Sequence, residues 1–182
     1  MAETDIVIFV EDPGAANYVA SLPTALARRG LTTHLLASGK AGEQLAALGG
    51  EFELLTDDAS TSTNLARRVT QLQPGLVVIG TSENLDSPAL PLVDQLRRRG
   101  APSVGVVDGP SNTDHRFRGR SERPLGHAPD WILVADDAVR DRFIKLGASP
   151  ARVLVGGHPR YDTVLDQGRA LAKTDRQLLR RR

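Results

Sequence analysis

Short apolar runs alternate with longer amphipathic segments along almost the whole chain. Runs such as Asp5–Val10 (DIVIFV) and Gly75–Gly80 (GLVVIG) are nearly continuously apolar and rich in β-branched residues, which is typical of strands buried on both faces. The predicted strands are Asp5–Val10, Thr32–Ala37, Phe52–Leu55, Gly75–Gly80, Ser103–Val107, Trp131–Ala135 and Arg152–Val155. The predicted helices are Ala15–Arg29, Ala41–Leu48, Ser60–Gln73, Pro88–Arg99, Asp137–Leu146 and Asp166–Arg182.

Strict alternation of strands and helices predicts an α/β fold. We expect a Rossmann-like, doubly wound parallel sheet in three layers, α/β/α. Pro23 lies inside the helix predicted for Ala15–Arg29 and is expected to bend or split it. Residues 1–163 are predicted to form this domain. Residues 164–182 are predicted to form a polar, arginine-rich connector with little left to pack against, so the domain resembles half of something larger.

Composition and charge exclude several classes of function. A chain of 182 residues suits one ordinary domain. A net charge of +1 argues against a surface for nucleic acid or anionic membranes. The absence of cysteine excludes disulfides, thiolate catalysis and Cys-based metal sites, and no histidine pair has metal-ligand spacing, so no metal site is predicted. Without a long apolar run or signal peptide, we expect no transmembrane segment and a cytoplasmic location.

The candidate binding residues follow the predicted strands. In doubly wound sheets, ligands bind beyond the carboxyl ends of the strands. This rule selects five places, which should share one rim of the sheet: Glu11–Asn17, Ser38–Lys40, Gly80–Asn84, Asp108–Asn112 and Asp136.

The segment after the first predicted strand reads Glu-Asp-Pro-Gly-Ala-Ala-Asn. Its spacing is not GxGxxG, and two carboxylates stand where a pyrophosphate would meet repulsion, which argues against a dinucleotide. A sugar or polyol held by Asp12 and Asn17 fits better, with Gly14 allowing the backbone to approach the ligand. Asp12 can equally cap a helix that begins at Pro13, and both roles can hold together.

Asp108 follows the predicted strand Ser103–Val107 and is a second candidate general base or hydroxyl binder. Turn chemistry alone also explains an Asp-Gly-Pro sequence. His158 lies in a Gly-Gly-His-Pro turn, where it can face an interdomain cleft or be a surface turn residue. The candidate catalytic residues are therefore Asp12 and Asp108, and the candidate substrate-binding residues are Gly14, Asn17, Ser82, Glu83, Asn112 and His158.

The segments Ser121–Val134, Leu146–Ala148 and Val153–Asp162 resemble the end of the N-terminal half of two-domain enzymes of the GT-B fold. The similarity is to the group that holds the UDP-N-acetylglucosamine 2-epimerases, the Kdo transferases and related polysaccharide-biosynthesis enzymes. The shared pattern is an arginine-led segment, a domain-closing strand and a Gly-x-Pro-x-x-Asp turn. The layout is similar over nearly the whole chain, whereas the specific motifs cover only its final part.

The resemblance implies a Rossmann-like N-terminal domain that mainly contacts the acceptor or the sugar. The nucleotide-diphosphate site would belong chiefly to a C-terminal half, and Thr174–Arg182 resembles the connector that enters it. The nucleotide sugar would be a co-substrate, with no further cofactor. The chain lacks the epimerase segment His-x-Glu-Ala-Gly where Asp108–Asn112 stands, which argues against an epimerase mechanism; His158 is carried over only as a residue facing the cleft.

Two interpretations of different classes follow. The first is the acceptor- or sugar-binding half of a nucleotide-sugar-dependent glycosyltransferase, or of an epimerase-like enzyme, in polysaccharide or glycoconjugate biosynthesis. Asp12 or Asp108 would then orient or deprotonate an acceptor hydroxyl, and a further domain or a partner subunit would complete the enzyme. The second is a free-standing, non-catalytic Rossmann- or flavodoxin-like domain that binds a small molecule. A hydrolase using Asp108 ranks last because no nucleophile–base pair is evident.

Overall fold

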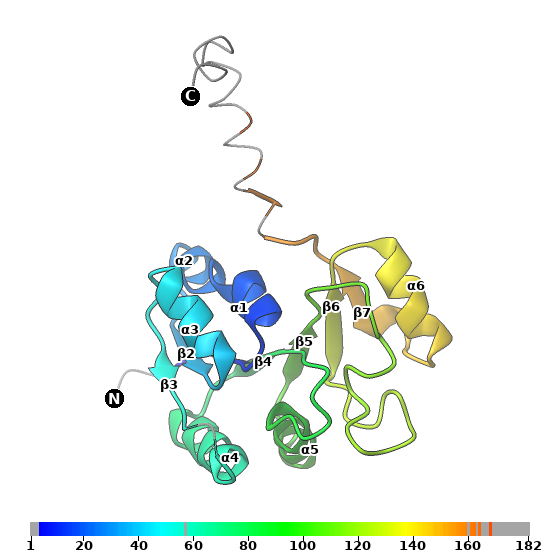
Figure 1. The fold of residues 1–182 in the computed structure, drawn as a ribbon, viewed down its shortest axis with the longest axis horizontal. Coiled ribbons are helices and arrows are strands. Elements are labelled where there is room, and N and C mark those ends of the chain that lie inside the picture. The colour runs from blue at the N-terminus through cyan, green and yellow to red at the C-terminus, as the bar shows by residue number, and fades with distance from the viewer. Residues whose placement is uncertain (1–3, 57, 160, 163, 165–167, 169–182) are drawn as a thin grey trace.

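One parallel sheet organises the protein. The computed structural model describes residues 4–56, 58–159, 161–162, 164 and 168. Within these residues, seven strands form a sheet in the order β3-β2-β1-β4-β5-β6-β7, and all neighbouring pairs are parallel (Figure 1). The strands are β1 Ile6–Val10, β2 Thr33–Ala37, β3 Glu53–Leu54, β4 Leu76–Gly80, β5 Ser103–Val106, β6 Trp131–Val134 and β7 Val153–Val155.

Helices cover both faces of the sheet (Figure 1). They are α1 Pro13–Val19, α2 Leu22–Ala27, α3 Lys40–Ala47, α4 Thr61–Leu72, α5 Ala89–Arg99 and α6 Asp137–Lys145, with a 3-10 turn, η1, at Pro150–Arg152. The alternating side chains of β1 divide the core, because Ile8 packs with α1 and α3 whereas Phe9 packs with α4 and α5. A third cluster joins α6 to β6, β7 and Phe117. The predicted three-layer, doubly wound α/β fold is confirmed.

The structure agrees with most predicted elements and divides one of them. The segment predicted as one helix over Ala15–Arg29 forms two helices, α1 and α2, and Pro23 lies in the first turn of α2. The long loop between β5 and β6 contains no helix or strand, but Phe117 in it is fully buried against Gly105 of β5. The helix predicted over Asp166–Arg182 lies outside the described residues except for Gly168, so it stays a prediction.

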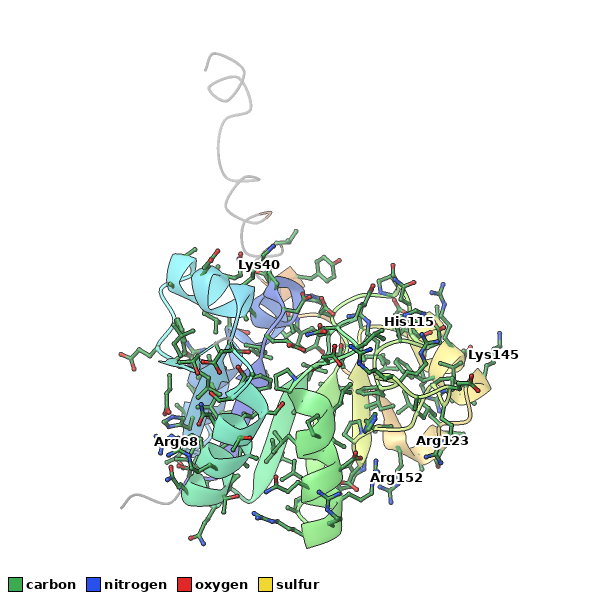
Figure 2. All side chains as sticks on the ribbon, turned by 60° about the horizontal axis from the view of Figure 1, so that its bottom comes forward. Lys40, Arg68, His115, Arg123, Lys145 and Arg152 are labelled. Atoms are coloured by element: carbon green, nitrogen blue, oxygen red, sulfur yellow. The ribbon has the colours of Figure 1, made fainter. Side chains whose placement is uncertain are left out.

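The sheet has a switch point between β1 and β4. These strands are neighbours, but the chain leaves β1 toward β2 and leaves β4 toward β5, on the opposite side. The carboxyl ends point to one side of the molecule: in Figure 2, Lys40 just after β2 and Arg152 just before β7 lie on opposite sides. The two connections that diverge at this point are the expected walls of a ligand crevice.

No helix in the described part of the chain is both long enough and apolar enough to cross a membrane.

Candidate functional site at the carboxyl ends of the strands

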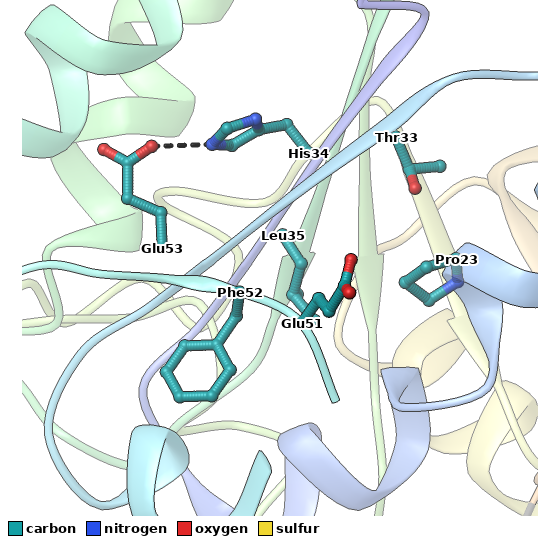
Figure 3. Close-up of a pocket in the computed structure, with 7 residues that line it drawn as sticks. All are labelled: Pro23, Thr33, His34, Leu35, Glu51, Phe52 and Glu53. Atoms are coloured by element: carbon teal, nitrogen blue, oxygen red, sulfur yellow. Dashed lines mark hydrogen bonds and ion pairs between the residues drawn. The ribbon is translucent and has the colours of Figure 1, made fainter. Parts of the chain in front are cut away.

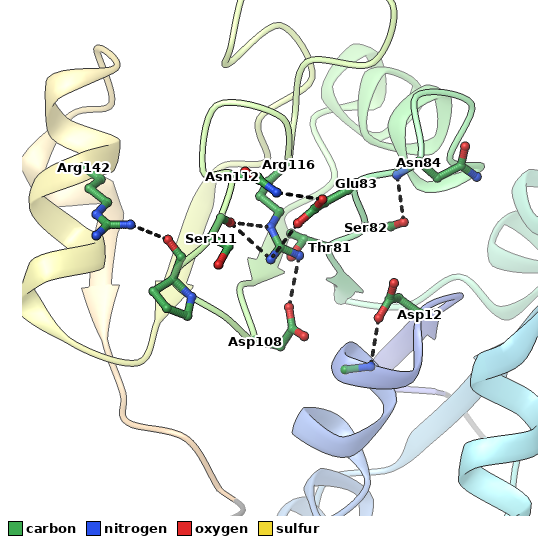
Figure 4. Close-up of polar contacts among 12 residues, drawn as sticks. Asp12, Thr81, Ser82, Glu83, Asn84, Asp108, Ser111, Asn112, Arg116 and Arg142 are labelled. Atoms are coloured by element: carbon green, nitrogen blue, oxygen red, sulfur yellow. Dashed lines mark hydrogen bonds and ion pairs between the residues drawn. The ribbon is translucent and has the colours of Figure 1, made fainter.

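Three loops meet at the carboxyl ends of β1, β4 and β5, and we call them together the carboxyl rim: residues 11–17, 81–87 and 108–116 (Figure 4). Asp108 contacts the first loop, because its Oδ2 atom lies against Gly14. Asn112 donates from Nδ2 to Glu83 Oε2 at 2.9 Å, which joins the second and third loops. The prediction that these loops share one rim is confirmed.

The other two predicted places sit at the margins of this rim. The amide of Ala41, just after Ser38–Lys40, donates to the carbonyl of Glu11 at 3.3 Å. Asp136 caps α6 by accepting from the amide of Val139 at 2.8 Å. These two segments therefore fix the ends of helices beside the rim.

Asp12 caps the first helix. Its Oδ1 atom accepts from the backbone amide of Gly14 at 2.8 Å, and Pro13 occupies the first helical position. The capping interpretation is confirmed. Asp12 Oδ2 makes no hydrogen bond within the described part of the chain, so a ligand role remains compatible with the cap.

Asp108 is paired with a buried arginine that the sequence analysis missed. Arg116 donates from Nη1 to Asp108 Oδ1 at 3.2 Å, contacts the carbonyl of Ser111 through Nε and Nη2, and lies 3.7 Å from Glu83 (Figure 4). Only 8% of its surface is exposed. Arg116 therefore fixes the second and third loops relative to each other, and its charge is taken up by two carboxylates of the protein.

Glu83, Asn112 and Ser82 all lie at the rim, as predicted. Asn112 adopts a left-handed backbone conformation with φ of 50°, which asparagine tolerates better than most residues. Ser82 is nearly buried and its hydroxyl accepts from the amide of Asn84 at 3.0 Å. Turn geometry and contacts within the protein therefore account for the positions of these three residues, and their expected ligand contacts stay predictions.

Gly14 and Asn17 have partners within the protein. A Cβ atom at Gly14 would lie 1.9 Å from Asp108 Oδ2, so the missing side chain admits Asp108 to the first turn of α1. Asn17 Oδ1 accepts from Gln44 Nε2 at 3.0 Å, which ties α1 to α3. Their expected ligand contacts stay predictions.

His158 lies where the chain leaves the sheet. Its ring packs between Tyr18 and Tyr161, with centroid distances of 4.8 and 5.5 Å. Tyr18 is buried, and its hydroxyl donates to the carbonyl of Gly157 at 2.8 Å. Burial also raises the pKa of the Tyr18 phenol above its ordinary value, so it keeps its proton at neutral pH. The Gly-Gly-His-Pro turn is thereby attached to α1, beside the first rim loop.

Glu11 has the most unusual environment at the rim. It follows β1 directly, and its Oε1 atom is buried without a hydrogen-bond partner among the described residues. Burial raises the pKa of this carboxyl above its ordinary value, Asp12 adds to the rise, and Ser87, Asn84 and Ser82 offset part of it. A buried polar atom without a partner calls for an explanation, and ligand binding is one.

The sequence carried only partial signals for these residues. Glu11 was part of a loop selected by the position rule, but nothing in the pattern distinguishes its burial from the exposure expected of a glutamate. Arg116 lies in a long polar loop whose arginines all look alike in sequence. Tyr18 occupies a core position of α1, and only the fold shows that it contacts the chain 139 residues later.

A separate hollow of about 370 Å³ lies near the amino-terminal ends of β2 and β3 (Figure 3). It is lined by Pro23, Thr33, His34, Leu35, Glu51, Phe52 and Glu53, none of which belongs to the carboxyl rim. His34 lies 2.6 Å from Glu53, which Arg68 also contacts through two hydrogen bonds. In the described residues, no group of three or more His, Asp or Glu side chains could hold a metal ion.

Comparisons with known proteins support the fold. No family model and no curated protein sequence matches the chain. Solved structures of UDP-GlcNAc 2-epimerases do match. The enzyme from Neisseria meningitidis aligns with a TM-score of 0.66 at 11% identity, over 93% of this chain and 51% of the other. The enzymes from Methanocaldococcus jannaschii and Rickettsia bellii align with TM-scores of 0.66 and 0.63 at 12% and 16% identity, each over 94% of this chain and 50% of theirs.

The chain has the fold of one half of these epimerases. This confirms the resemblance to GT-B-like enzymes at the level of fold, and identities this low extend the conclusion no further. The chain spans about half the length of the solved structures that it matches.

Proposed function

We propose that this chain is the sugar- or acceptor-binding half of a nucleotide-sugar-dependent enzyme, either a glycosyltransferase or an epimerase-like enzyme. The observation that carries the proposal is the carboxyl rim at the β1/β4 switch point, where Glu11, Asp12, Glu83 and Asp108 gather in a fold shared with half of UDP-GlcNAc 2-epimerases. Carboxylates and amides are suitable partners for sugar hydroxyls.

The charge of the rim supports a division of labour. Its buried cation, Arg116, already contacts Asp108 and Glu83, and the first loop adds two more carboxylates, Glu11 and Asp12. A diphosphate would meet repulsion there, whereas neutral hydroxyls would not. A second domain, on the same polypeptide or a partner subunit, would bind the nucleotide diphosphate. The residues before 164 would form the first domain and residues 164–182 the connector.

The reaction would use rim carboxylates for hydroxyl groups. In glycosyl transfer, the acceptor oxygen would form a bond to the anomeric carbon while the bond from that carbon to the diphosphate breaks, and a carboxylate would take the hydroxyl proton. Asp12 retains an oxygen without a hydrogen bond from the described residues, and Asp108 Oδ2 lies beside Gly14 at the same rim. His158, beside Tyr18, would border the crevice on the side of the second domain.

Calorimetric titration of UDP, UDP-sugars and free sugars against this chain tests the division of labour. We expect weak binding of sugars and no tight binding of UDP, because an open, one-sided crevice buries little of a ligand. Tight UDP binding to these 182 residues would contradict the proposal. It would favour the alternative of a self-sufficient small-molecule-binding domain.

The proton-transfer roles are tested in the two-domain protein. Asp12→Asn and Asp108→Asn should each be assayed for turnover, with Asp94→Asn, on α5 away from the rim, as the control. Loss of a general base should lower turnover on the order of 10²–10⁴-fold. Near-parental turnover in both rim variants would remove Asp12 and Asp108 from this role.

A further inference from the structure

Glu11 stands at the switch point of the sheet. It is the first residue after β1, the strand that lies beside β4 in the sheet, so it lies where the two connections diverge. Its backbone carbonyl accepts from Ala41 of α3 at 3.3 Å, which fixes the start of the loop. The side chain is therefore attached to a rigid part of the fold at the centre of the expected crevice.

The other rim carboxylates have strong partners, whereas Glu11 has a weak one. Asp12 accepts from the Gly14 amide, Asp108 from Arg116 and Glu83 from Asn112. Glu11 Oε2 lies 3.5 Å from Asn84 Nδ2, at the limit of a hydrogen bond, and Oε1 is buried with no partner among the described residues. Burial of the carboxyl group therefore costs hydration that Ser87, Asn84 and Ser82 compensate only in part.

Part of the cover over Glu11 comes from the polar loop 81–87, whose residues Ser82, Asn84 and Ser87 lie near the carboxyl group. Ser82 and Ser87 are buried. Asn84 is exposed, and local turn contacts hold it in place. Its backbone amide donates to the Ser82 hydroxyl, and its Oδ1 atom accepts from the backbone amide of Asp86, both at 3.0 Å. Rotation of the Asn84 side chain would break its 3.5 Å contact with Glu11 Oε2 and its 3.0 Å hydrogen bond from the Asp86 amide, and would uncover the Oε2 side of the carboxyl group.

We propose that Glu11 is the hydroxyl acceptor of the carboxyl rim: a sugar or polyol displaces the Asn84 amide and donates a hydrogen bond from one of its hydroxyl groups to the Glu11 carboxylate. This inference rests on the proposed function, because it assumes that the rim binds a hydroxyl-bearing ligand. It adds a named contact and a chemical requirement, a ligand hydroxyl positioned at the end of β1. No covalent bond is made or broken in this step.

Binding at Glu11 is coupled to a proton. Burial raises the pKa of Glu11 in the free protein, and a hydroxyl that donates to the ionised form lowers it again. Ligand binding therefore releases a proton wherever free Glu11 is partly protonated, and affinity rises with pH through that range. The charged and titratable groups on the surrounding elements are Asp12 on the same loop, Glu83 and Asp86 on the second loop, Asp108, Asp114, His115 and Arg116 on the third, and Lys40 and Glu43 on α3.

The test compares the chain with Glu11→Gln, Glu11→Asp and the control Glu51→Gln, which changes an exposed carboxylate outside the rim. N-acetylglucosamine, glucose and inositol are titrated between about pH 4.5 and 7.5 and followed by NMR chemical shifts. The carboxyl carbon of Glu11 is followed in the same samples. Calorimetry in buffers of different ionisation enthalpy counts the released protons.

We expect wild type and Glu51→Gln to bind at least one probe with affinity that rises with pH, with a fall in the Glu11 pKa on binding. Glu11→Gln should bind roughly 10-fold more weakly and lose the pH dependence, as expected for a lost charged hydrogen bond. Glu11→Asp retains the negative charge but has a shorter side chain, which moves the carboxylate oxygens away from the ligand, so it should also bind the probes more weakly. This variant tests the inference if Glu11→Gln does not fold.

Two negative results have different meanings. Probe binding that is unchanged in Glu11→Gln and Glu11→Asp would overturn this inference and leave the proposed function standing. Absence of binding to wild type for every probe, with UDP bound instead, would overturn both.

Discussion

The Oδ2 atom of Asp108 lies against Gly14, in the space that a side chain at that position would fill. A Cβ atom there would be 1.9 Å from the oxygen. Asp108 follows β5 and Gly14 lies in the first turn of α1, so this contact joins two loops across the switch point. The same carboxylate is held by Arg116 through Oδ1. Glycine at position 14 is thus a condition for the geometry of the rim.

Gly14→Ala should therefore destabilise the protein through Asp108. Alanine favours the helix by roughly 0.5–1 kcal/mol, but the overlap with a carboxylate should outweigh this gain, with a net loss of about 1–3 kcal/mol. In an Asp108→Ala background the same substitution should be neutral or stabilising. Urea unfolding of the two single variants and the double variant measures the coupling, and equal effects of Gly14→Ala in both backgrounds would contradict the contact.

Arg116→Ala should lower the free energy of unfolding by about 3 kcal/mol, because it leaves the half-buried Asp108 carboxylate without its partner. Arg120→Ala is the matched control. It removes an arginine of the same loop whose ion pair with Asp86 is largely exposed, and its effect should be far smaller. Chemical denaturation of both variants checks the contrast. Similar losses would mean that burial of Arg116 contributes little.

Tyr18→Phe should cost about 1 kcal/mol and loosen the turn at residues 156–159, since it removes only the hydroxyl that donates to Gly157. Tyr161→Phe changes an exposed tyrosine beside the same histidine and should leave both properties unchanged. Amide hydrogen exchange of the turn, with thermal unfolding, distinguishes the two variants. Unchanged exchange in Tyr18→Phe would show that ring packing alone holds the turn.

Glu53 should give the protein a small acid sensitivity. Desolvation raises the pKa of Glu53, but hydrogen bonds from Arg68 and His34 outweigh it and bring the net pKa below its usual 4.5. The stabilisation is therefore complete above that value and is lost as pH falls through the lower folded pKa. Because the group is half-exposed, we expect about 1 kcal/mol or less. Unfolding of Glu53→Gln between pH 3 and 7 should show a weaker pH dependence than Glu51→Gln.

The fold was predictable because local patterns and global packing agree. β1 is buried on both faces, and its continuous, β-branched apolar run in the sequence is typical of a central parallel strand. Pro23 predicted the break between α1 and α2 because its backbone chemistry is local. The cap at Asp12 was predictable for the same reason, since the acceptor and donor lie two residues apart.

The site was less predictable because its geometry depends on contacts between distant residues. The rule that ligands bind after the strands selected the correct loops, but the sequence did not show which side chains within these loops would contact one another. Arg116 reaches Asp108 and Glu83 from a loop whose sequence has no helical or strand period. Burial of the Glu11 carboxyl depends on side chains more than 70 residues later in the chain, as its contact with Asn84 shows. Such effects need the assembled sheet.

The hydrogen bond from the Tyr18 hydroxyl to the carbonyl of Gly157 fixes the point at which the polypeptide leaves the sheet. The exit turn is anchored to the helix that starts at the first rim loop, rather than to the outer strand β7 that precedes it. The direction in which the polypeptide continues beyond this turn is therefore set by the same helix that begins at the first rim loop.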